Sequence, residues 1–300
     1  MKYASYKKGF KVYLQLERAL SANTVEAYLH DADLLFNFLI HAENEKSLQQ
    51  IKLKDLRSFI SFINKMEFAP YSQARIISGI KTFFRYLIEE QIIHEDPTEL
   101  LEAPKLGRKL PDILSIDEIF KIIESVDLSS KQGERNKAII ETLYGCGLRV
   151  SELIGLKISD LHFNEGFISV TGKGNKQRLV PIVKSASKQI DIYLNQVRML
   201  GKIQKKSEDI VFLNVRGGKM SRQMIFLVVK KQAELAGIRK TISPHTFRHS
   251  FATHLVQNGA DLRAVQDLLG HSSIITTEIY THLDSKDLRK AVLKYHPRSL

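Results

Sequence analysis

The chain has 300 residues, 43% of them hydrophobic and 8% aromatic, which is enough apolar sequence for two domains with buried cores and argues against a disordered protein. A single cysteine excludes an internal disulfide bond, and the sequence has no signal-peptide pattern and no apolar run of about 18 residues, so we expect a soluble protein of the cytoplasm. The formal net charge of +12 lies in the second part, since residues 1–104 carry 13 Lys and Arg against 14 Asp and Glu, and residues 105–300 carry 32 against 19. A basic domain of this kind is compatible with nucleic-acid binding but does not establish it.

The first hundred residues predict four amphipathic helices, because apolar residues recur at helical spacing in four separate stretches. The clearest stripe runs from Val25 to Leu39, and Asn23 with Glu26 three residues later predicts a capping box at its start. The other stripes lie within residues 10–17, 56–63 and 76–87. Four such helices predict a small all-α domain over residues 1–104. Four polar side chains could form its DNA-facing side: Gln73, Arg75, Lys81 and Arg85.

Residues 105–112 are predicted to be an interdomain linker, since the surrounding stretch holds three prolines and a basic cluster. Helical structure resumes at a second capping-box pattern, Ser115 with Glu118. The second domain, residues 113–300, is predicted to be mostly helical with a small antiparallel β-sheet, because F-I-S-V-T and Q-R-L-V-P-I flank the turn sequence G-K-G-N-K. Its further helices are expected near residues 185–200, 221–236, 244–257, 261–269 and 273–282.

Six residues of the second domain have chemistry suited to phosphoryl transfer: Arg149, Lys173, His245, Arg248, His271 and Tyr280. Cleaving a phosphodiester without water requires a nucleophile, cations for the non-bridging oxygens and an acid for the departing oxygen. Tyr280 offers the hydroxyl, the two arginines can clamp one phosphate, and Lys173 at the hairpin tip could reach the leaving oxygen. His245 and Arg248 share one face of a helix that begins near Pro244, and the amino end of that helix favours an anion.

Most of these residues also have an ordinary structural interpretation. Arg149 could form a surface pair with Glu152, Lys173 could be a solvated turn residue, and His271 could cap or pack at a helix junction. Tyr280 taken alone would be a half-buried tyrosine of an amphipathic helix, and its ordinary pKa of about 10 means that attack needs help from cations or a base. It is the combination of the six residues that favours catalysis.

The histidines near residue 245 and the single cysteine bear on metal binding and redox chemistry. His245 and His249 stand at i,i+4 and could bind a metal ion, but the glutamate of an H-E-x-x-H motif is missing and Arg248 lies beside them. We therefore expect no metal and no other cofactor. Cys146 follows Tyr144 and Gly145 in an apolar stretch and is expected to be a buried apolar residue rather than a reactive thiol.

Together these segments resemble the tyrosine recombinases, the phage-integrase family, and over essentially the whole chain they resemble the bacterial XerC and XerD enzymes that resolve chromosome dimers. The resemblance rests on five segments in this order: G-L-R-V-S-E-L-I-G-L, G-K-G-N-K-Q-R-L-V-P, P-H-T-F-R-H-S-F-A-T-H-L, L-L-G-H-S-S and I-Y-T-H. It implies an N-terminal SAM-like core-binding domain and a C-terminal catalytic domain that clamp duplex DNA. Q-I-I-H-E-D-P and G-K-G-N-K-Q-R favour XerD, while a role as XerC or as a single Xer enzyme stays open.

The resemblance also implies a mechanism. Tyr280 attacks the scissile phosphate to give a 3′-phosphotyrosyl link, Lys173 protonates the departing 5′ oxygen, and Glu152 supports Arg149. Neither ATP nor a metal is required, because the phosphotyrosyl ester conserves the energy of the cleaved phosphodiester bond. The freed 5′-hydroxyl of a partner strand then attacks this ester, and the exchange of strands forms a Holliday junction. Charge stabilisation and proton transfer are assigned to Arg149, Arg248, His245 and His271.

Partners follow from the same resemblance. Family members act as a tetramer on two DNA sites, so we expect a monomer without DNA and a tetramer on DNA, which could be a hetero-tetramer with a second Xer recombinase. Each subunit lends its C-terminal helix to a neighbour, and Lys286–Leu300 would be that segment here. A DNA translocase of the FtsK type is a candidate activator, and a dif-type chromosomal site is the expected substrate.

Three alternatives stay open. A phage or transposon integrase would use the same chemistry, but such enzymes often carry an extra arm-binding domain ahead of the core-binding helices. A type IB topoisomerase would form the same phosphotyrosyl link without synapsis. An architectural DNA-binding protein with a decayed site would keep the fold and the charge, although Tyr280 and both arginines are intact here.

Overall fold

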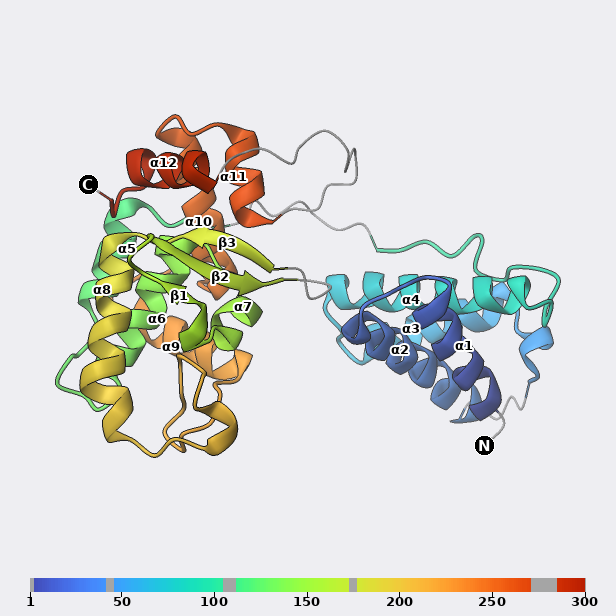
Figure 1. The fold of residues 1–300 in the computed structure, drawn as a ribbon. Helices are drawn as coiled ribbons and strands as arrows, with labels where there is room; N and C mark the ends of the chain where they lie inside the picture. Colours follow the sequence, from blue (N-terminus) through green and yellow to red (C-terminus); the bar gives the residue numbers. More distant parts are fainter. Residues whose placement is uncertain (1–2, 42–45, 105–111, 173–176, 271–284, 300) are drawn as a thin grey trace. The chain divides into compact units, whose positions relative to one another are not determined.

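The structure is a computed structural model that describes residues 3–41, 46–104, 112–172, 177–270 and 285–299. The chain forms two compact units, Met1–Lys109 and Leu110–Leu300 (Figure 1). The linker predicted at residues 105–112 falls almost wholly outside the described residues, so its limits stay a prediction. Within the described ranges, no helix has the length and apolar character needed to cross a membrane.

The N-terminal unit has the four helices that its apolar stripes predict: α1 (Ala4–Leu16), α2 (Ala22–His41), α3 (Leu53–Lys65) and α4 (Pro70–Glu89). A short 3₁₀ turn, η1 (Leu48–Gln50), precedes α3. Phenylalanines fill the core, where the Phe83 ring lies edge-on to Phe10 at 5.1 Å and to Phe36 at 5.3 Å. These contacts join α4 to both α1 and α2, so the aromatic cluster sets the packing of three helices.

The capping box predicted at Asn23 is wrong. Helix α2 begins at Ala22, one residue before Asn23, and the hydroxyl of Ser21 accepts a weak hydrogen bond from the Thr24 backbone N–H at 3.4 Å. Ser21, Asn23 and Thr24 are all residue types that can cap a helix, and the hydrogen bond to Ser21 shows that the helix starts at the first of them.

An ion pair between a buried carboxylate and a half-exposed arginine links α2 and α4. Asp31 is fully buried, and its Oδ2 accepts a hydrogen bond from Arg75 Nη1 at 2.6 Å. Its Oδ1 has no hydrogen-bond partner. Gly79 leaves room for this carboxylate, because a Cβ at that position would stand 2.5 Å from Asp31 Oδ2. A carboxylate placed in mid-helix is thus held by one half-exposed arginine.

The C-terminal unit starts with the capping box predicted at Ser115: the Ser115 hydroxyl accepts from Glu118 N at 3.1 Å, and Glu118 Oε2 accepts from Ser115 N at 2.7 Å. Three helices precede the sheet, with α6 at the centre of the core. Their bounds are α5 (Ile116–Glu124), α6 (Gly133–Cys146) and α7 (Val150–Gly155). Cys146 at the end of α6 is buried, as predicted, and burial raises the pKa of its thiol.

The sheet is antiparallel with the order β1-β2-β3, formed by β1 (Leu161–His162), β2 (Phe167–Thr171) and β3 (Gln177–Pro181). The hairpin β2–β3 is the one predicted, with Phe167 opposite Pro181 and Thr171 opposite Gln177. Strand β1 was not predicted, since two residues give no periodic signal. A turn, η2 (Ile158–Asp160), leads into it.

Helices α9 (Arg222–Leu235), α10 (Pro244–Gln257) and α11 (Leu262–Leu269) follow the ranges predicted for them, whereas η6 (Lys205–Ser207) and α12 (Ser285–Tyr295) match none of the predicted ranges. The helix expected at 185–200 is α-helical only as α8 (Lys184–Ile192) and continues as a π turn, η4 (Tyr193–Val197), and a 3₁₀ turn, η5 (Arg198–Leu200). The range 273–282 lies outside the described residues.

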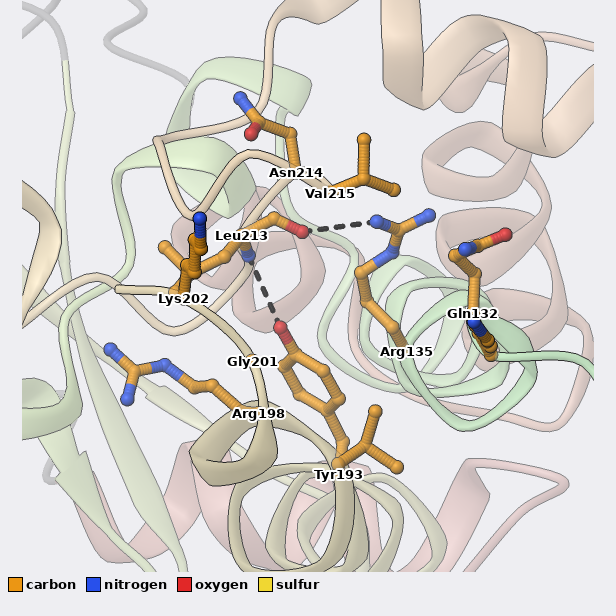
Figure 2. Close-up of a pocket in the computed structure, with 11 residues that line it drawn as sticks. Gln132, Arg135, Tyr193, Arg198, Gly201, Lys202, Leu213, Asn214 and Val215 are labelled. Carbon is orange, nitrogen blue, oxygen red and sulfur yellow. Dashed lines mark hydrogen bonds between the residues drawn. The ribbon is translucent and has the colours of Figure 1, made fainter. Parts of the chain in front are cut away.

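Figure 2 shows how Leu213, which lies between η6 and α9, is hydrogen-bonded to the start of α6 and to η4. Arg135 is buried, and its Nη1 donates to the Leu213 carbonyl at 3.1 Å. The Leu213 N–H in turn donates to the Tyr193 hydroxyl at 3.2 Å. A hollow of about 230 Å³ lies against these residues. Arg135 therefore has a structural role at the opposite end of α6 from Gly147, where the candidate site begins.

The C-terminal segment packs on its own unit. Helix α12 contacts β3, α10 and α11. His296, which follows the helix, is fully buried beside Tyr144, and Arg298 forms an ion pair with Glu141. The exchange of Lys286–Leu300 between subunits stays a prediction, and its described part is docked within one chain here.

Candidate active site

The site begins where α6 ends. Gly147 has the left-handed conformation (φ 59°) that closes the helix, and a Cβ there would lie 2.5 Å from Phe251 Cδ1, so only glycine fits. Arg149 follows in extended backbone as the N-cap of α7, and its N–H donates to Glu152 Oε2 at 2.8 Å. The segment G-C-G-L-R-V-S-E-L thus forms a helix end, a turn and a helix start, which fixes the backbone of Arg149.

Two partners of the Arg149 side chain lie among the residues that the structure describes. Its Nη1 donates to Glu152 Oε1 at 3.0 Å, and its Nη2 donates to the Gly270 carbonyl at 3.0 Å. The ion pair between Arg149 and Glu152, which the sequence suggested as a purely structural role for Arg149, is therefore present. It is not a surface pair, because the Glu152 side chain is 1% exposed, whereas that of Arg149 is 34% exposed. Arg149 is anchored from behind and keeps an accessible face.

Arg248 lies on α10, which begins at Pro244 as predicted, and its side chain is buried. Its Nη1 donates to the Gly147 carbonyl at 2.7 Å, and its Nη2 donates to the Leu269 carbonyl. Burial, with the positive charges of Arg149 and Arg178, lowers the pKa of Arg248 to about 10 despite Glu152 nearby. The guanidinium still carries its charge near neutral pH.

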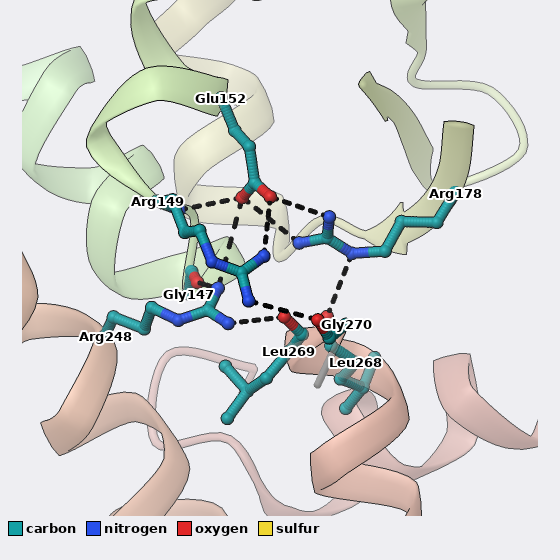
Figure 3. Close-up of polar contacts among 8 residues, drawn as sticks. All are labelled: Gly147, Arg149, Glu152, Arg178, Arg248, Leu268, Leu269 and Gly270. Atoms are coloured by element: carbon teal, nitrogen blue, oxygen red, sulfur yellow. Dashed lines mark hydrogen bonds and ion pairs between the residues drawn. The ribbon is translucent and has the colours of Figure 1, made fainter. Parts of the chain in front are cut away.

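A third arginine, which was not predicted from the sequence, joins the cluster. Arg178 on β3 donates from Nη1 to Glu152 Oε1 at 2.7 Å and from Nη2 to Glu152 Oε2 at 3.1 Å (Figure 3). The residue faces inward with Val180, two positions along the strand, while Leu179 between them is half exposed. Arg178 shares the parity of Val180, but the apolar Leu179 on the other face gives the sequence a competing signal.

Glu152 is the acceptor at the centre of this cluster. Burial by itself raises the pKa of its carboxyl, but hydrogen bonds from Arg178 and from Arg149 outweigh that effect, and the pKa lies below its ordinary value. Arg248 Nη1 is 4.0 Å from Glu152 Oε2. Three guanidinium groups therefore surround one carboxylate, which leaves an excess of positive charge suited to an anion.

The histidines of α10 divide into two kinds. His245 in the first turn and His249 are exposed, whereas His254 is buried and its Nδ1 lies 2.9 Å from the Tyr144 hydroxyl. Because it is buried, His254 is a core residue rather than a ligand for DNA, and its burial lowers the pKa of the ring. His245 stands at the amino end of α10, one turn before Arg248, as the spacing predicts.

Three of the six predicted residues, Lys173, His271 and Tyr280, lie outside the described residues. The structure places their chain neighbours. Lys173 falls between β2 and β3, and His271 directly follows Gly270, whose carbonyl Arg149 holds. The described members that come together are Arg149 and Arg248, joined by Glu152 and Arg178.

Comparisons with known proteins identify the family of this chain. The model of the "Phage integrase family" matches residues 113–287, and that of the "Phage integrase, N-terminal SAM-like domain" matches residues 8–91. The chain is 40% identical over 290 residues to the tyrosine recombinase XerD of Listeria innocua, covering 97% of this chain and 98% of that protein. It is 41% identical to XerD of Oceanobacillus iheyensis, with 97% and 98% covered.

Among solved structures, a XerH site-specific recombinase bound to palindromic difH substrate, in a post-cleavage complex, is similar with a TM-score of 0.69 and 26% identity, over 92% of this chain and 81% of that one. The family models match both domains, and the relatives and the XerH structure match nearly the whole chain. The chain belongs to the phage integrase family and is an XerD-like tyrosine recombinase, a site-specific DNA recombinase by activity.

Proposed function

We propose that the protein cuts and rejoins duplex DNA through a 3′-phosphotyrosyl intermediate and a Holliday junction, with Tyr280 as the nucleophile. The observation that carries the proposal is the convergence of Arg149 and Arg248 on one point of the structure, with more positive charge than the single carboxylate of Glu152 neutralises. A scissile phosphate gains negative charge on its non-bridging oxygens as it is attacked, and fixed guanidinium groups stabilise that charge.

The reaction requires no water and no cofactor. The Tyr280 oxygen forms a bond to phosphorus as the bond from phosphorus to the 5′ oxygen breaks, and Lys173 gives the departing oxygen its proton. His245 and His271 hydrogen-bond the phosphate, and one of them accepts the proton that the Tyr280 hydroxyl loses as it attacks. Rejoining reverses these steps when a 5′-hydroxyl attacks the phosphotyrosyl link.

The two described arginines differ in what they offer the phosphate. Arg248 is buried and uses two of its donors on the carbonyls of Gly147 and Leu269, so it acts mainly as a fixed charge. Arg149 is one-third exposed, so it can present a guanidinium edge to a non-bridging oxygen.

We further propose a dif-type chromosomal site as the substrate and the resolution of chromosome dimers in the cytoplasm as the task. The support is the XerD name of the relatives and the difH substrate bound to the similar XerH recombinase. A tetramer on two sites, with a second Xer recombinase and an FtsK-like activator, completes the proposal.

A suicide substrate tests the nucleophile. A nicked duplex with a Xer-type site from the source chromosome is incubated with wild type, Tyr280→Phe and Tyr295→Phe, and the products are separated on a denaturing gel. Wild type and Tyr295→Phe, which changes a tyrosine of α12 outside the motif, are expected to give a 3′-linked protein–DNA adduct, and Tyr280→Phe none. Tight binding by wild type without an adduct would point instead to an architectural protein or to a missing activator.

Relaxation of plasmids that lack any such site would indicate a topoisomerase. Recombination only at sites of a mobile element would indicate an integrase. Both outcomes would overturn the chromosomal task while keeping the chemistry.

A further inference from the structure

A carboxylate placed between two arginines that serve a phosphate poses an electrostatic problem. Glu152 is needed where it is, because it caps α7 through the Arg149 N–H and anchors the Arg149 side chain. The same negative charge attracts Arg149 and Arg248 and offsets the field that they exert on a phosphate. The site therefore contains a group that holds an arginine in position and weakens it at the same time.

Arg178 resolves this conflict. Its guanidinium binds both oxygens of Glu152, at 2.7 Å and 3.1 Å, in the two-point geometry that suits a carboxylate. No other side chain in the described residues makes a two-point contact with Glu152. The Arg178 side chain is 19% exposed and also donates from Nε towards the Leu268 carbonyl at 3.4 Å. Figure 3 shows it opposite Arg149 across the Glu152 carboxylate.

We infer that Arg178 is a positioning residue for the recombination reaction: it neutralises Glu152 and thereby leaves the charge of Arg149 and Arg248 available to the scissile phosphate. This inference rests on the proposed function, which makes those two arginines the phosphate-binding pair. With Arg178 in place, three guanidinium groups face the single carboxylate of Glu152. Without Arg178, only two guanidinium groups face that carboxylate. Glu152 would then draw Arg149 and Arg248 more strongly towards itself.

This role predicts a change of sign that a purely structural role does not. With Arg178 present, Glu152→Gln removes the anchor of Arg149 and lowers the cleavage rate. With Arg178 replaced by methionine, the unneutralised carboxylate is the harmful group, so Glu152→Gln is expected to raise the rate. A scaffold contact would give the opposite result, since the second change would remove one more hydrogen-bond partner.

The test is single-turnover cleavage of the nicked suicide duplex by the full-length protein, with DNA binding and thermal unfolding measured alongside. Arg178→Met is expected to lower the rate of adduct formation about 100-fold, as for loss of a charge-stabilising donor, with DNA affinity close to wild type. Arg178→Met with Glu152→Gln is expected to recover about tenfold of that loss. Arg239→Met, which removes an exposed arginine of the same unit, is the matched control for the loss of one positive charge.

Arg178→Lys keeps the charge without the two-point geometry and is expected to fall between wild type and Arg178→Met, which provides a readout if the methionine variant does not fold. The inference is overturned if Arg178→Met cleaves as fast as Arg239→Met, or if Glu152→Gln lowers the rate further in the Arg178→Met protein. A wild-type protein that binds the site tightly but forms no adduct overturns the proposal that the protein cleaves DNA without an activator, which separates that failure from the failure of the Arg178 inference.

Discussion

Arg149 Nη2 donates a hydrogen bond to the Gly270 carbonyl at 3.0 Å, which joins two sequence segments 121 residues apart. The neighbouring carbonyls at the end of α11 are held in the same way, that of Leu269 by Arg248 and that of Leu268 by Arg178. The carbonyl end of a helix carries partial negative charge, so three guanidinium groups are well placed there. The arginine cluster consequently fixes the residue that directly precedes His271.

Arg149→Lys tests whether the planar guanidinium matters. A lysine keeps the charge but cannot bind Glu152, the Gly270 carbonyl and a phosphate from one ammonium group. We expect the single-turnover cleavage rate to fall about 100-fold while DNA affinity stays near that of wild type, because other phosphate contacts remain. Arg239→Lys, the same change at an exposed site, should cleave normally. Equal rates for the two variants would remove Arg149 from the reaction.

Gly147→Ala tests the turn between α6 and α7. An alanine would adopt a positive φ, which disfavours L-residues by about 1–2 kcal/mol, and its Cβ would lie 2.5 Å from the Phe251 ring, which adds the effect of overpacking. We expect the free energy of unfolding to fall by about 2–4 kcal/mol in urea denaturation.

Gly237→Ala is the matched control for that change. Gly237 also has a positive φ (71°), but no atom lies within 4 Å of the position of a Cβ. This variant should show only the backbone effect, about 1–2 kcal/mol. A loss of stability as large as that of Gly147→Ala would show that the Phe251 contact contributes nothing.

Helices with a wide apolar stripe could be predicted from the sequence, because burial of that stripe supplies most of the free energy that stabilises them. The hairpin was equally plain, since a glycine-rich turn separates two apolar strands. Helix ends were less certain: at Ser21 and Asn23 nearby polar residues compete for the cap, and the choice depends on packing of the whole helix. The end of the α-helical part at Ile192 could not be predicted from the local sequence either. The Tyr193 side chain that follows is hydrogen-bonded to Leu213, which is 20 residues away in the chain.

The site could be predicted in part. Arg149 and Arg248 stood out because they lie in dense motifs, but their partner Arg178 did not, since Q-R-L-V-P by itself does not show which face of the strand is inward. The register places Arg178 opposite Val170 and so turns it to the interior. The contact between Arg178 and Glu152 depends on which face of β3 is buried. Tertiary packing decides this, and the sequence of the strand alone does not.

Arg75→Met tests the ion pair between α2 and α4. Its loss would leave the buried Asp31 carboxyl, whose pKa burial already raises, without the cation that opposes that rise. We expect a loss of about 2 kcal/mol of unfolding free energy at pH 7, less than for a fully buried pair because the carboxyl can take up a proton. Asp31→Asn in the same protein should restore part of it by removing the charge.

Arg85→Met provides the comparison, since Arg85 is exposed on the same helix and its loss should change stability by less than about 0.5 kcal/mol. If Arg75→Met is as mild as Arg85→Met, or if Asp31→Asn makes the Arg75 variant worse, the pair does not hold the two helices together.

The stability of the C-terminal unit should fall on acidification because of His296. Its ring is fully buried, Nδ1 accepts from the Arg298 N–H at 3.0 Å, and Nε2 therefore carries the hydrogen that points to the Tyr144 carbonyl at 3.3 Å. Protonation would place a second hydrogen against the Arg298 N–H. Burial lowers the pKa of His296 to about 3, against an ordinary value of 6.5.

Between these two values the unfolded chain binds a proton that the folded protein does not, so stability rises with pH across this window and is lost as the pH falls below 6.5. One such proton changes the free energy of unfolding by about 1.4 kcal/mol per pH unit, or about 2 kcal/mol between pH 6.5 and 5. His254, whose pKa burial also lowers, adds to the slope in the same direction. Urea denaturation at a series of pH values measures how the free energy of unfolding depends on pH. His296→Gln should reduce this slope by the equivalent of about one proton. His249→Gln, which removes an exposed imidazole of α10, is the control and should leave the slope unchanged. An unaltered slope in His296→Gln would mean that His296 is accessible to protons in the folded state, and hence that the segment after α12 is released from Tyr144 in solution.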